Sequence, residues 1–154
     1  MSISNATPAN ATSAAMSREE TLQFFARRQV QYENFDAAGL AADYADDAVI
    51  ESPLSGQHGK RDAEANLRNI FSAFMDFKMT PEAVIVDGTR VAQLVTSEGT
   101  NIGGLFGLPP SGKPFKTSVV MIYELRGRQI VREQRVYDFT GVLLQVGVLK
   151  AKPV

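Results

Sequence analysis

The sequence predicts a single α+β domain in which helices pack on one face of a curved antiparallel sheet. Between residues 17 and 77 apolar side chains recur at helical spacing, whereas residues 78–137 contain segments rich in β-branched and aromatic residues. Two gaps between those segments, Asp87-Gly88 and Arg126-Gly127, have the composition of hairpin turns. Helices first and consecutive strands afterwards indicate the α+β class.

The N-terminal half predicts three helices and one short strand. Ser17 and Glu20 have the spacing of a capping box, so a first helix is expected from Ser17 to Asn34. Asp36 is placed to cap a second, Ala-rich helix that ends near Tyr44. The remaining elements expected here are a turn at Asp46-Asp47, a strand over 48–52 that Pro53 ends, a loop through Gly59, and a third helix over 60–77.

The C-terminal half predicts the sheet. Strands are expected over 78–86, 90–102, 115–125 and 129–137, with a long Gly- and Pro-rich connection over 103–114 and a final short helix over 140–148. We expect residues 1–16 to be a disordered tail, residues 17–149 to be the folded domain, and residues 150–154 to be a C-terminal tail.

The composition excludes several classes of protein. A chain of 154 residues suits one domain, and the absence of Cys excludes disulfides, thiolate zinc sites and a thiol nucleophile. A net charge of -1 gives no field that would collect phosphates, and no apolar run is long enough to span a bilayer. With one His and no Cys, no metal site is predicted. We therefore expect a soluble, cytoplasmic protein without a cofactor, a nucleic-acid partner or a membrane partner.

One segment matches part of the sequence pattern of a phosphate-binding loop but lacks residues that such a loop needs. Gly107 to Lys113 fits the pattern, yet Pro114 stands where Ser or Thr is required. Pro109 and Pro110 also remove two of the backbone N–H donors that a phosphate cradle needs. Nucleotide binding is not predicted.

Three motifs resemble those of a known family. They are Tyr44-Ala45-Asp46-Asp47-Ala48-Val49, Gly107-Leu108-Pro109-Pro110-Ser111-Gly112-Lys113, and Tyr137-Asp138-Phe139-Thr140-Gly141-Val142-Leu143-Leu144-Gln145-Val146-Gly147. The second and third motifs are similar to those of the SnoaL-like polyketide cyclase (ester cyclase) family. The first is similar to a helix-to-strand junction of many proteins in the nuclear-transport-factor-two-like superfamily, which includes that family. The resemblance covers about residues 16–148. It implies a cone-shaped fold around a deep apolar pocket and a homodimer formed through the sheet.

The family's catalytic pair is replaced in this sequence. The resemblance implies an acid/base Asp on the last strand and a His on the preceding strand, and these positions are Arg135 and Met121 here. Neither side chain accepts a substrate proton at neutral pH. The isomerase pattern of the superfamily falls on Ser52, Arg28 and Met121, and the epoxide hydrolase pattern falls on Asn101, Gly99, Arg135, Ile50 and Ser52, so both are incomplete as well.

Strand alternation identifies the residues that remain on the expected pocket face. If Arg135 points inward, Glu133 and Tyr137 share its face, and Tyr123 shares that of Met121. Arg135 would hold a substrate carbonyl or carboxylate while Glu133 acts as a base; the alternative is a structural ion pair.

The other candidates have structural alternatives too. His58 is either a base at the pocket mouth or an exposed loop residue, and Asp138 is either catalytic or the N-cap of the last helix. Candidate ligand-binding residues are Arg28, Tyr32, Tyr44, Ser52, Phe71, Phe74, Asn101, Met121 and Tyr123. For Tyr32, Tyr44, Phe71, Phe74 and Met121 the alternative is a place in the hydrophobic core.

The functional prediction is a cofactor-independent protein that acts on a small hydrophobic carbonyl compound. The expected chemistry is proton transfer leading to cyclisation, isomerisation or lyase-type cleavage, with Arg135 stabilising an oxyanion and Glu133 or His58 as the base. The alternative is a non-catalytic protein on the same fold that binds a small molecule or a partner.

Overall fold

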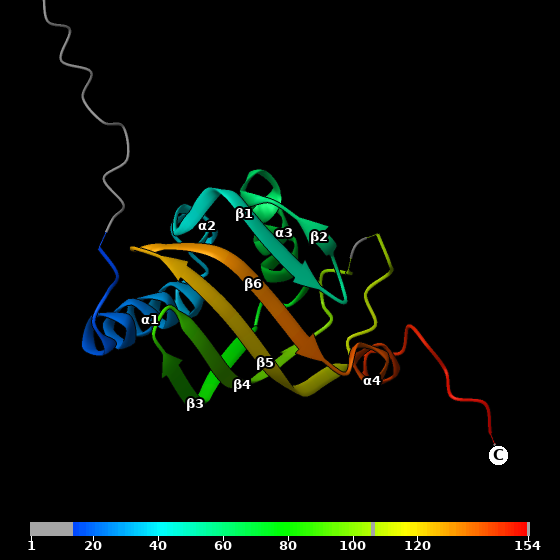
Figure 1. Ribbon diagram of the computed structural model, residues 1–154. Helices are drawn as coiled ribbons and strands as arrows, with labels where there is room; N and C mark the ends of the chain where they lie inside the picture. The colour runs from blue at the N-terminus through cyan, green and yellow to red at the C-terminus, as the bar shows by residue number, and fades with distance from the viewer. Residues whose placement is uncertain (1–13, 106, 154) are drawn as a thin grey trace, which may run out of the picture.

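The protein is described by a computed structural model that covers residues 14–105 and 107–153. The elements are α1 (Arg18–Glu33), α2 (Ala37–Ala42), β1 (Tyr44–Ser52), β2 (Gly56–His58), α3 (Lys60–Ala73), β3 (Lys78–Asp87), β4 (Arg90–Thr100), β5 (Pro114–Arg126), β6 (Gln129–Tyr137) and α4 (Phe139–Gln145) (Figure 1). They confirm the predicted α+β class. Most of the predicted N-terminal tail lies outside the described residues, so that prediction stays untested.

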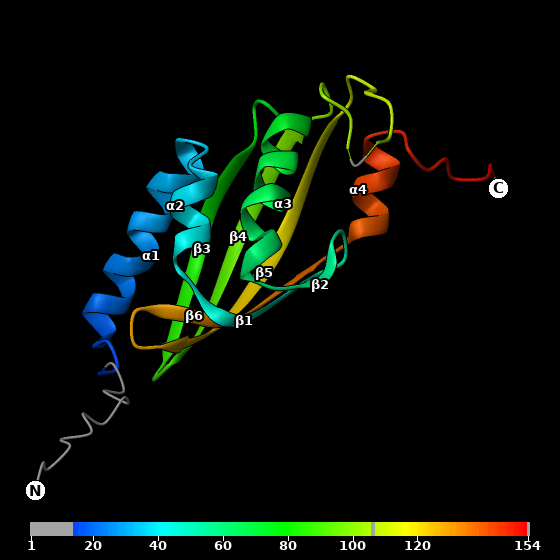
Figure 2. The ribbon, with the colours of Figure 1, turned by 90° about the horizontal axis from the view of Figure 1, so that it is seen from above.

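All six strands form one curved sheet in the order β2-β1-β6-β5-β4-β3. Figure 2 shows the sheet curling round α3, with α1 and α2 on the same side and α4 at the far end beside the connection between β4 and β5. Side chains alternate across β5, so that Val119, Met121 and Tyr123 are buried under the helices while Val120 and Ile122 face outward. The inner face of the sheet and the helices therefore enclose the core.

Three of the helices begin at the caps that the sequence indicates. Ser17 and Glu20 form the expected capping box, with backbone-to-side-chain distances of 2.8 and 3.1 Å. Asp36 and Asp138 cap α2 and α4 in the same way, each accepting a hydrogen bond from the backbone N–H of the residue three positions later. The N-cap alternative for Asp138 is thus the one that the structure shows.

Strand β1 differs from its prediction in two respects. Asp46 and Asp47, expected to form a turn, lie inside the strand, because the pairing with β6 shifts register between Tyr44 and Val49 and leaves both carboxylates exposed. Asp47 there accepts hydrogen bonds from Arg126. The β1–β6 pairing is also parallel, so the sheet is not antiparallel throughout.

Two other boundaries differ from the prediction. Residues 56–58, expected to be loop, form the short strand β2 paired with β1. Helix α3 ends at Ala73 instead of residue 77, because Phe74 leaves helical geometry and turns inward. The backbone N–H groups of Ile102 and Gly103 then bind the carbonyl of Ala73, at 3.2 and 3.0 Å.

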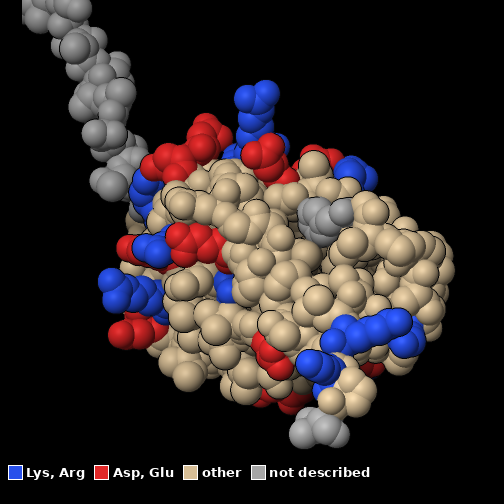
Figure 3. Space-filling model, turned by 90° about the vertical axis from the view of Figure 1, so that its right-hand side faces the viewer, with Lys and Arg blue, Asp and Glu red and all other residues tan. Residues whose placement is uncertain are grey.

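Surface charge is uneven. At the end of the molecule that carries α4, most of the visible surface is uncharged and the charged side chains lie largely at its margins (Figure 3). Among the described residues, no helix combines the length and the apolar character needed to cross a membrane.

Candidate functional site

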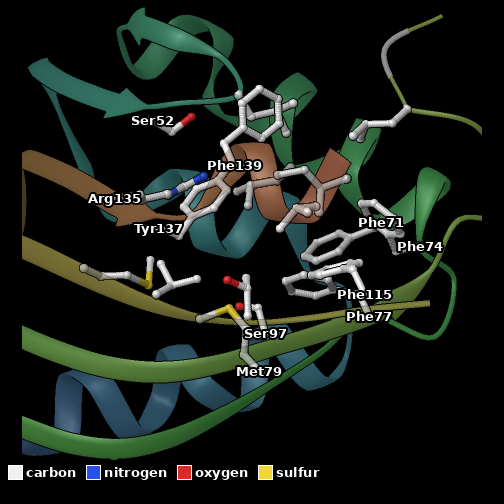
Figure 4. A pocket seen from close by; sticks show the side chains of 18 of the residues that line it. Ser52, Phe71, Phe74, Phe77, Met79, Ser97, Phe115, Arg135, Tyr137 and Phe139 are labelled. Carbon is white, nitrogen blue, oxygen red and sulfur yellow. The ribbon is translucent and has the colours of Figure 1, made fainter. Parts of the chain in front are cut away.

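A mostly apolar cavity lies between α3, α4 and the inner face of the sheet (Figure 4). It leaves about 90 Å³ for the centres of water-sized molecules. Since one water needs roughly 10–15 Å³ on this measure, the space suits several waters or one small organic molecule. The described walls come from parts of the chain as distant as Tyr32 and Val142.

One end of the cavity is aromatic. Phe71 and Phe74 project from the end of α3, and Phe77 follows where the chain leaves the helix. The rings of Phe74 and Phe115 meet edge to face with their centroids 4.8 Å apart, and those of Phe71 and Phe77 lie 5.9 Å apart. This end offers flat apolar surfaces to a ligand.

The opposite end carries a cation. Figure 4 shows Arg135 there, with Ser52 and Tyr137 beside it, across the cavity from the aromatic end. The Arg135 side chain is only 13% exposed, and its Nε donates a hydrogen bond of 2.7 Å to Glu133 Oε1. Within the described ranges, Nε is the Arg135 nitrogen that donates to a protein acceptor, and the two terminal nitrogens form no such bond. They are therefore available to a ligand oxygen.

Glu133 lies behind Arg135 and holds it. The carboxylate is fully buried; Oε1 accepts from Arg135, Oε2 accepts from the Tyr44 hydroxyl, and the residue does not line the cavity. Burial alone would raise the pKa of Glu133, but the charges of Arg135 and Arg28 and the two hydrogen bonds lower that pKa below its usual value. Glu133 is therefore ionised and turned away from the ligand space, which does not suit the predicted role of a base.

Arg28 forms a second buried cation in the same region. Its Nη1 donates to the Leu40 carbonyl at 3.0 Å and to Asp43 Oδ2 at 2.8 Å, and its guanidinium carbon lies 5.5 Å from the centre of the Tyr44 ring. Among the described residues, Nε and Nη2 have no hydrogen-bond partner. The polar end of the cavity is thus backed by a buried network of charged and phenolic groups.

The predicted site residues fall into three groups. Those that line the cavity are Tyr32, Ser52, Phe71, Phe74, Met121 and Arg135. Those that lie in the buried layer behind its polar end are Arg28, Tyr44, Tyr123 and Glu133. Those that belong neither to the lining nor to that layer are His58, Asn101 and Asp138.

Each residue of the last group has a local role instead. His58 is partly buried on β2 near Ser55, and burial, together with the Arg135 charge, lowers its pKa. Asn101 is buried and fixes the connection between β4 and β5, since its backbone bonds Lys113 and Gly112 at 3.0 and 2.9 Å. Asp138 is exposed and caps α4.

Sequence reasoning missed a substantial part of the lining. Thr117 and Val119 lie on β5 at two-residue steps from Met121, so alternation would have placed them on the same face. Phe139 and Val142 reach the cavity from α4, and Leu105 does so from an irregular connection. No periodicity in the sequence marks those three positions.

The described lining contains no Asp, Glu or His. Its phenols are those of Tyr32 and Tyr137, and burial raises the pKa of both. The walls therefore offer hydrogen-bond donors and one fixed positive charge, without a side chain that takes up a proton near neutral pH. The described residues also contain no cluster of three or more His, Cys, Asp or Glu that would suit a metal ion.

Comparison with known proteins gives a family match. The sequence model of the SnoaL-like polyketide cyclase family matches residues 22–146. No match was found among curated proteins.

Solved structures give fold matches at low identity. AclR from Streptomyces galilaeus is 20% identical with a TM-score of 0.77, over 89% of this chain and 87% of that one. IdmH from Streptomyces antibioticus, described as a candidate polyketide cyclase, is 22% identical with a TM-score of 0.69, over 82% and 97%. An NTF2-like protein from Burkholderia pseudomallei is 19% identical with a TM-score of 0.72, over 85% and 98%. At these identities the likeness shows the fold alone.

Proposed function

The chain belongs to the SnoaL-like polyketide cyclase family, and from this premise we propose that it binds a small aromatic carbonyl compound and promotes its cyclisation without a cofactor. The observation that carries the proposal is the Arg135 guanidinium at one end of an otherwise apolar cavity. A cation held in a partly dry pocket stabilises an oxygen that gains negative charge during a reaction.

The proposed reaction is an intramolecular aldol addition. A carbon next to one carbonyl loses a proton to a base from solvent, and the resulting enolate carbon forms a C–C bond to a second carbonyl carbon of the same molecule. The second carbonyl becomes an alkoxide, which takes up a proton. Arg135 would bind the enolate or alkoxide oxygen, where the negative charge resides.

The proposal assigns Glu133 a positioning role. The sequence suggested Glu133 as a base, but both of its oxygens have donors and it lies outside the cavity lining. Its contact with Arg135 Nε instead fixes the plane of the guanidinium. His58 and Asp138 have no part in the proposed reaction.

A second candidate function is binding without catalysis. The described lining contains no titratable base, and a carrier needs only affinity. Cyclisation by substrate polarisation predicts that the rate rises with pH as the substrate itself ionises. A carrier would bind the same compounds and leave their rate of ring closure unchanged.

The proposal includes a homodimer formed through the outer face of the sheet. That face carries exposed apolar side chains, among them Leu94, Val120, Ile122 and Val136. An apolar patch of this kind is typical of a protein interface. Residence in the cytoplasm stays a prediction.

The test compares variants with and without the cavity cation. Arg135→Met alone would leave Glu133 buried without its partner, at a cost of about 3–5 kcal/mol. We therefore choose the E133Q/R135M double variant, beside E133Q alone. The matched control is Arg132→Met, because Arg132 lies on the same strand with its side chain 55% exposed.

Two measurements separate the candidate functions. Calorimetric titration with 2-naphthoate should show that E133Q/R135M binds at least about tenfold more weakly than the Arg132→Met control, since a charge-assisted contact is lost. Ring closure of an aryl 1,5-diketone should be accelerated by the wild type and not by the double variant. Equal binding by the double variant and the wild type would refute the role of Arg135, and binding without acceleration would favour the carrier.

A further inference from the structure

The proposed reaction takes its base from solvent, yet two hydroxyl groups join the cavity to a histidine outside it. Ser52 lines the cavity at its polar end, beside Arg135 (Figure 4). Ser52 Oγ lies 2.7 Å from Ser55 Oγ, and Ser55 Oγ lies 3.5 Å from His58 Nδ1. The second distance is at the long end of the hydrogen-bond range, as catalytic hydrogen bonds often are before the substrate binds.

The hairpin between β1 and β2 fixes this arrangement. Ser52 is the last residue of β1 and pairs with Gly56, and His58 stands two pairs further from the turn. Gly56 has a φ of 64°, a left-handed conformation that glycine adopts without strain. The tight turn that results brings Ser55 close enough to contact both Ser52 and His58.

The hydrogen bonds at Ser52 give the hydroxyl groups a direction. The backbone N–H of Ser55 donates to Ser52 Oγ at 3.0 Å and occupies one of the two lone pairs of that oxygen. The Ser52 proton can then bind Ser55 Oγ, and the Ser55 proton can bind His58 Nδ1. The second lone pair of Ser52 remains for a ligand, since Ser52 lines the cavity. Each hydroxyl can therefore pass a proton away from the cavity and towards the imidazole.

His58 suits the end of such a path, because it can take up a proton and is half-buried rather than enclosed. The charged groups that act on it are Arg135 and Glu133 of β6 and Asp62 of α3. Burial and the positive charge of Arg135 lower the pKa of His58, and they outweigh the two carboxylates, which raise it. The imidazole is therefore neutral near pH 7 and has one nitrogen with a free lone pair.

Arg135 and Ser52 stand side by side on neighbouring strands. Strands β1 and β6 are parallel, and the pair Glu51–Gln134 comes directly before these two residues. Both side chains line the cavity. A carbonyl whose oxygen binds Arg135 has its neighbouring carbon two bonds away from that oxygen, and therefore near the side chains that flank Arg135. The proton that the reaction must remove lies on this carbon.

We infer that Ser52, Ser55 and His58 form a proton relay that takes the proton from the carbon next to the bound carbonyl. Ser52 Oγ accepts this proton while its own proton moves to Ser55 Oγ, and the Ser55 proton moves to His58 Nδ1. The electron pair of the broken C–H bond stays in the enolate, and the imidazole becomes an imidazolium. After ring closure the reverse transfer returns a proton to the alkoxide, so that no proton is gained or lost overall.

The inference rests on the proposed function, because it presumes that Arg135 binds the carbonyl oxygen. The proposed function does not depend on the relay, since a base from solvent would serve as well. Ser52 would touch the substrate, whereas His58 acts on it through the two serines.

The test measures proton removal without ring closure. The probe is 2-tetralone, a ketone with the two-ring shape of 2-naphthoate, and NMR in D₂O follows the exchange of its C1 protons. The wild type should accelerate this exchange, and Ser52→Ala and His58→Gln should each lower the protein-dependent rate about a hundredfold. Gln57→Ala is the matched control, because Gln57 is an exposed neighbour of His58 on β2. Binding of 2-naphthoate should change little in all three variants, since each keeps Arg135.

The pH dependence separates proton transfer from a structural role. Wild-type exchange should fall as the pH drops through the pKa of His58, because an imidazolium accepts no proton. Glutamine does not titrate, so this inflection should be lost in His58→Gln. An inflection that persists in His58→Gln would refute the relay.

A spectroscopic measurement on the unchanged chain covers the case in which a variant does not fold. The chain has 1 His, so the ¹⁵N signals of its imidazole need no assignment. Above the pKa of His58, its proton should lie on Nε2, because Nδ1 must accept from Ser55. A neutral ring that carries its proton on Nδ1 would overturn the inference.

The outcomes also separate the relay from the proposed function. If E133Q/R135M loses naphthoate binding while Ser52→Ala and His58→Gln exchange 2-tetralone as fast as the wild type, the relay is wrong and the function stands. A wild type that does not accelerate exchange also refutes the relay, and the naphthoate and diketone measurements then decide the function on their own.

Discussion

Glu133 is the residue on which the geometry of the polar end depends. A buried carboxylate is tolerated only when ion pairs and hydrogen bonds replace the lost water. Glu133 has one donor on each oxygen, Arg135 on the cavity side and Tyr44 on the opposite side. These contacts fix the carboxylate, which in turn fixes Arg135, so that residues outside the cavity determine how its cation is presented.

Removing the Tyr44 hydroxyl should therefore destabilise the fold. We expect Tyr44→Phe to lower the free energy of unfolding by about 2 kcal/mol, because a buried charged group loses a hydrogen bond. Tyr123→Phe should cost less, since the hydrogen bond of the Tyr123 hydroxyl among the described groups is a weak one, to the Met121 sulfur at 3.5 Å. Urea unfolding measures the loss of stability in each variant, provided that the m-values equal that of the wild type. Equal losses for the two variants would contradict the assigned role of Tyr44.

The sequence predicted part of this network. Alternation along β6 put Glu133 on the same face as Arg135, and both side chains lie on the inner face. The register, which alternation does not predict, pairs Met121 with Arg135 and Tyr123 with Glu133. The contact of Tyr44 with Glu133 joins residues 89 positions apart. Periodicity within one element carries no information about such a contact, so the sequence alone does not show that both Glu133 oxygens are already bonded.

At the scale of elements, α4 has an N-cap that can be predicted from the sequence and also forms part of the cavity wall. Asp138 accepts a hydrogen bond of 2.8 Å from the Gly141 N–H, and Phe139 and Val142 of the same helix line the cavity. Helix α2 has the same cap, with 2.9 Å between Asp36 and the Gly39 N–H, but none of its described residues lines the cavity. The two helices thus have the same kind of N-cap and differ in whether they line the cavity.

Asp138→Ala and Asp36→Ala should have similar effects on stability and different effects on binding. Each loses an N-cap, which costs about 1 kcal/mol. Only Asp138→Ala should also weaken 2-naphthoate binding, because it loosens a helix that forms the cavity wall. Thermal unfolding and calorimetric titration measure the two quantities. A loss of binding in Asp36→Ala as large as in Asp138→Ala would show that the effect is global.

Element boundaries were predictable where local chemistry decides them. Nearby residues were enough to predict four of these boundaries: the capping box at Ser17, the caps at Asp36 and Asp138, and the hairpin at Gly127. The start of strand β1 was harder to predict, because two adjacent Asp residues are typical of a turn. The strand forms by pairing with β6, which is far away in the sequence. Tertiary pairing decided that element.

At the scale of the molecule, the two faces of the sheet differ in what covers them. The inner face packs under the helices and forms the cavity wall. The outer face has no covering element among the described residues, yet it carries a row of apolar side chains: Leu94 pairs with Val120, and Val120 pairs with Val136. Their exposures of 40, 37 and 50% are high for adjacent large apolar residues. The fold class was predictable from periodicity, whereas a homodimer through this face was implied by the family resemblance alone and stays a prediction.

A second copy of the chain is the partner we expect on the outer face, and Val120→Lys tests it. Val120 is the middle residue of the apolar row, so a charge there would be buried without a partner in a dimer and solvated in a monomer. Sedimentation velocity should show a dimer for the wild type and a monomer for Val120→Lys. Val30→Lys is the control, because Val30 is 52% exposed on α1, away from the sheet. A monomeric wild type, or a Val120→Lys variant that still dimerises, would exclude this face as the dimer interface.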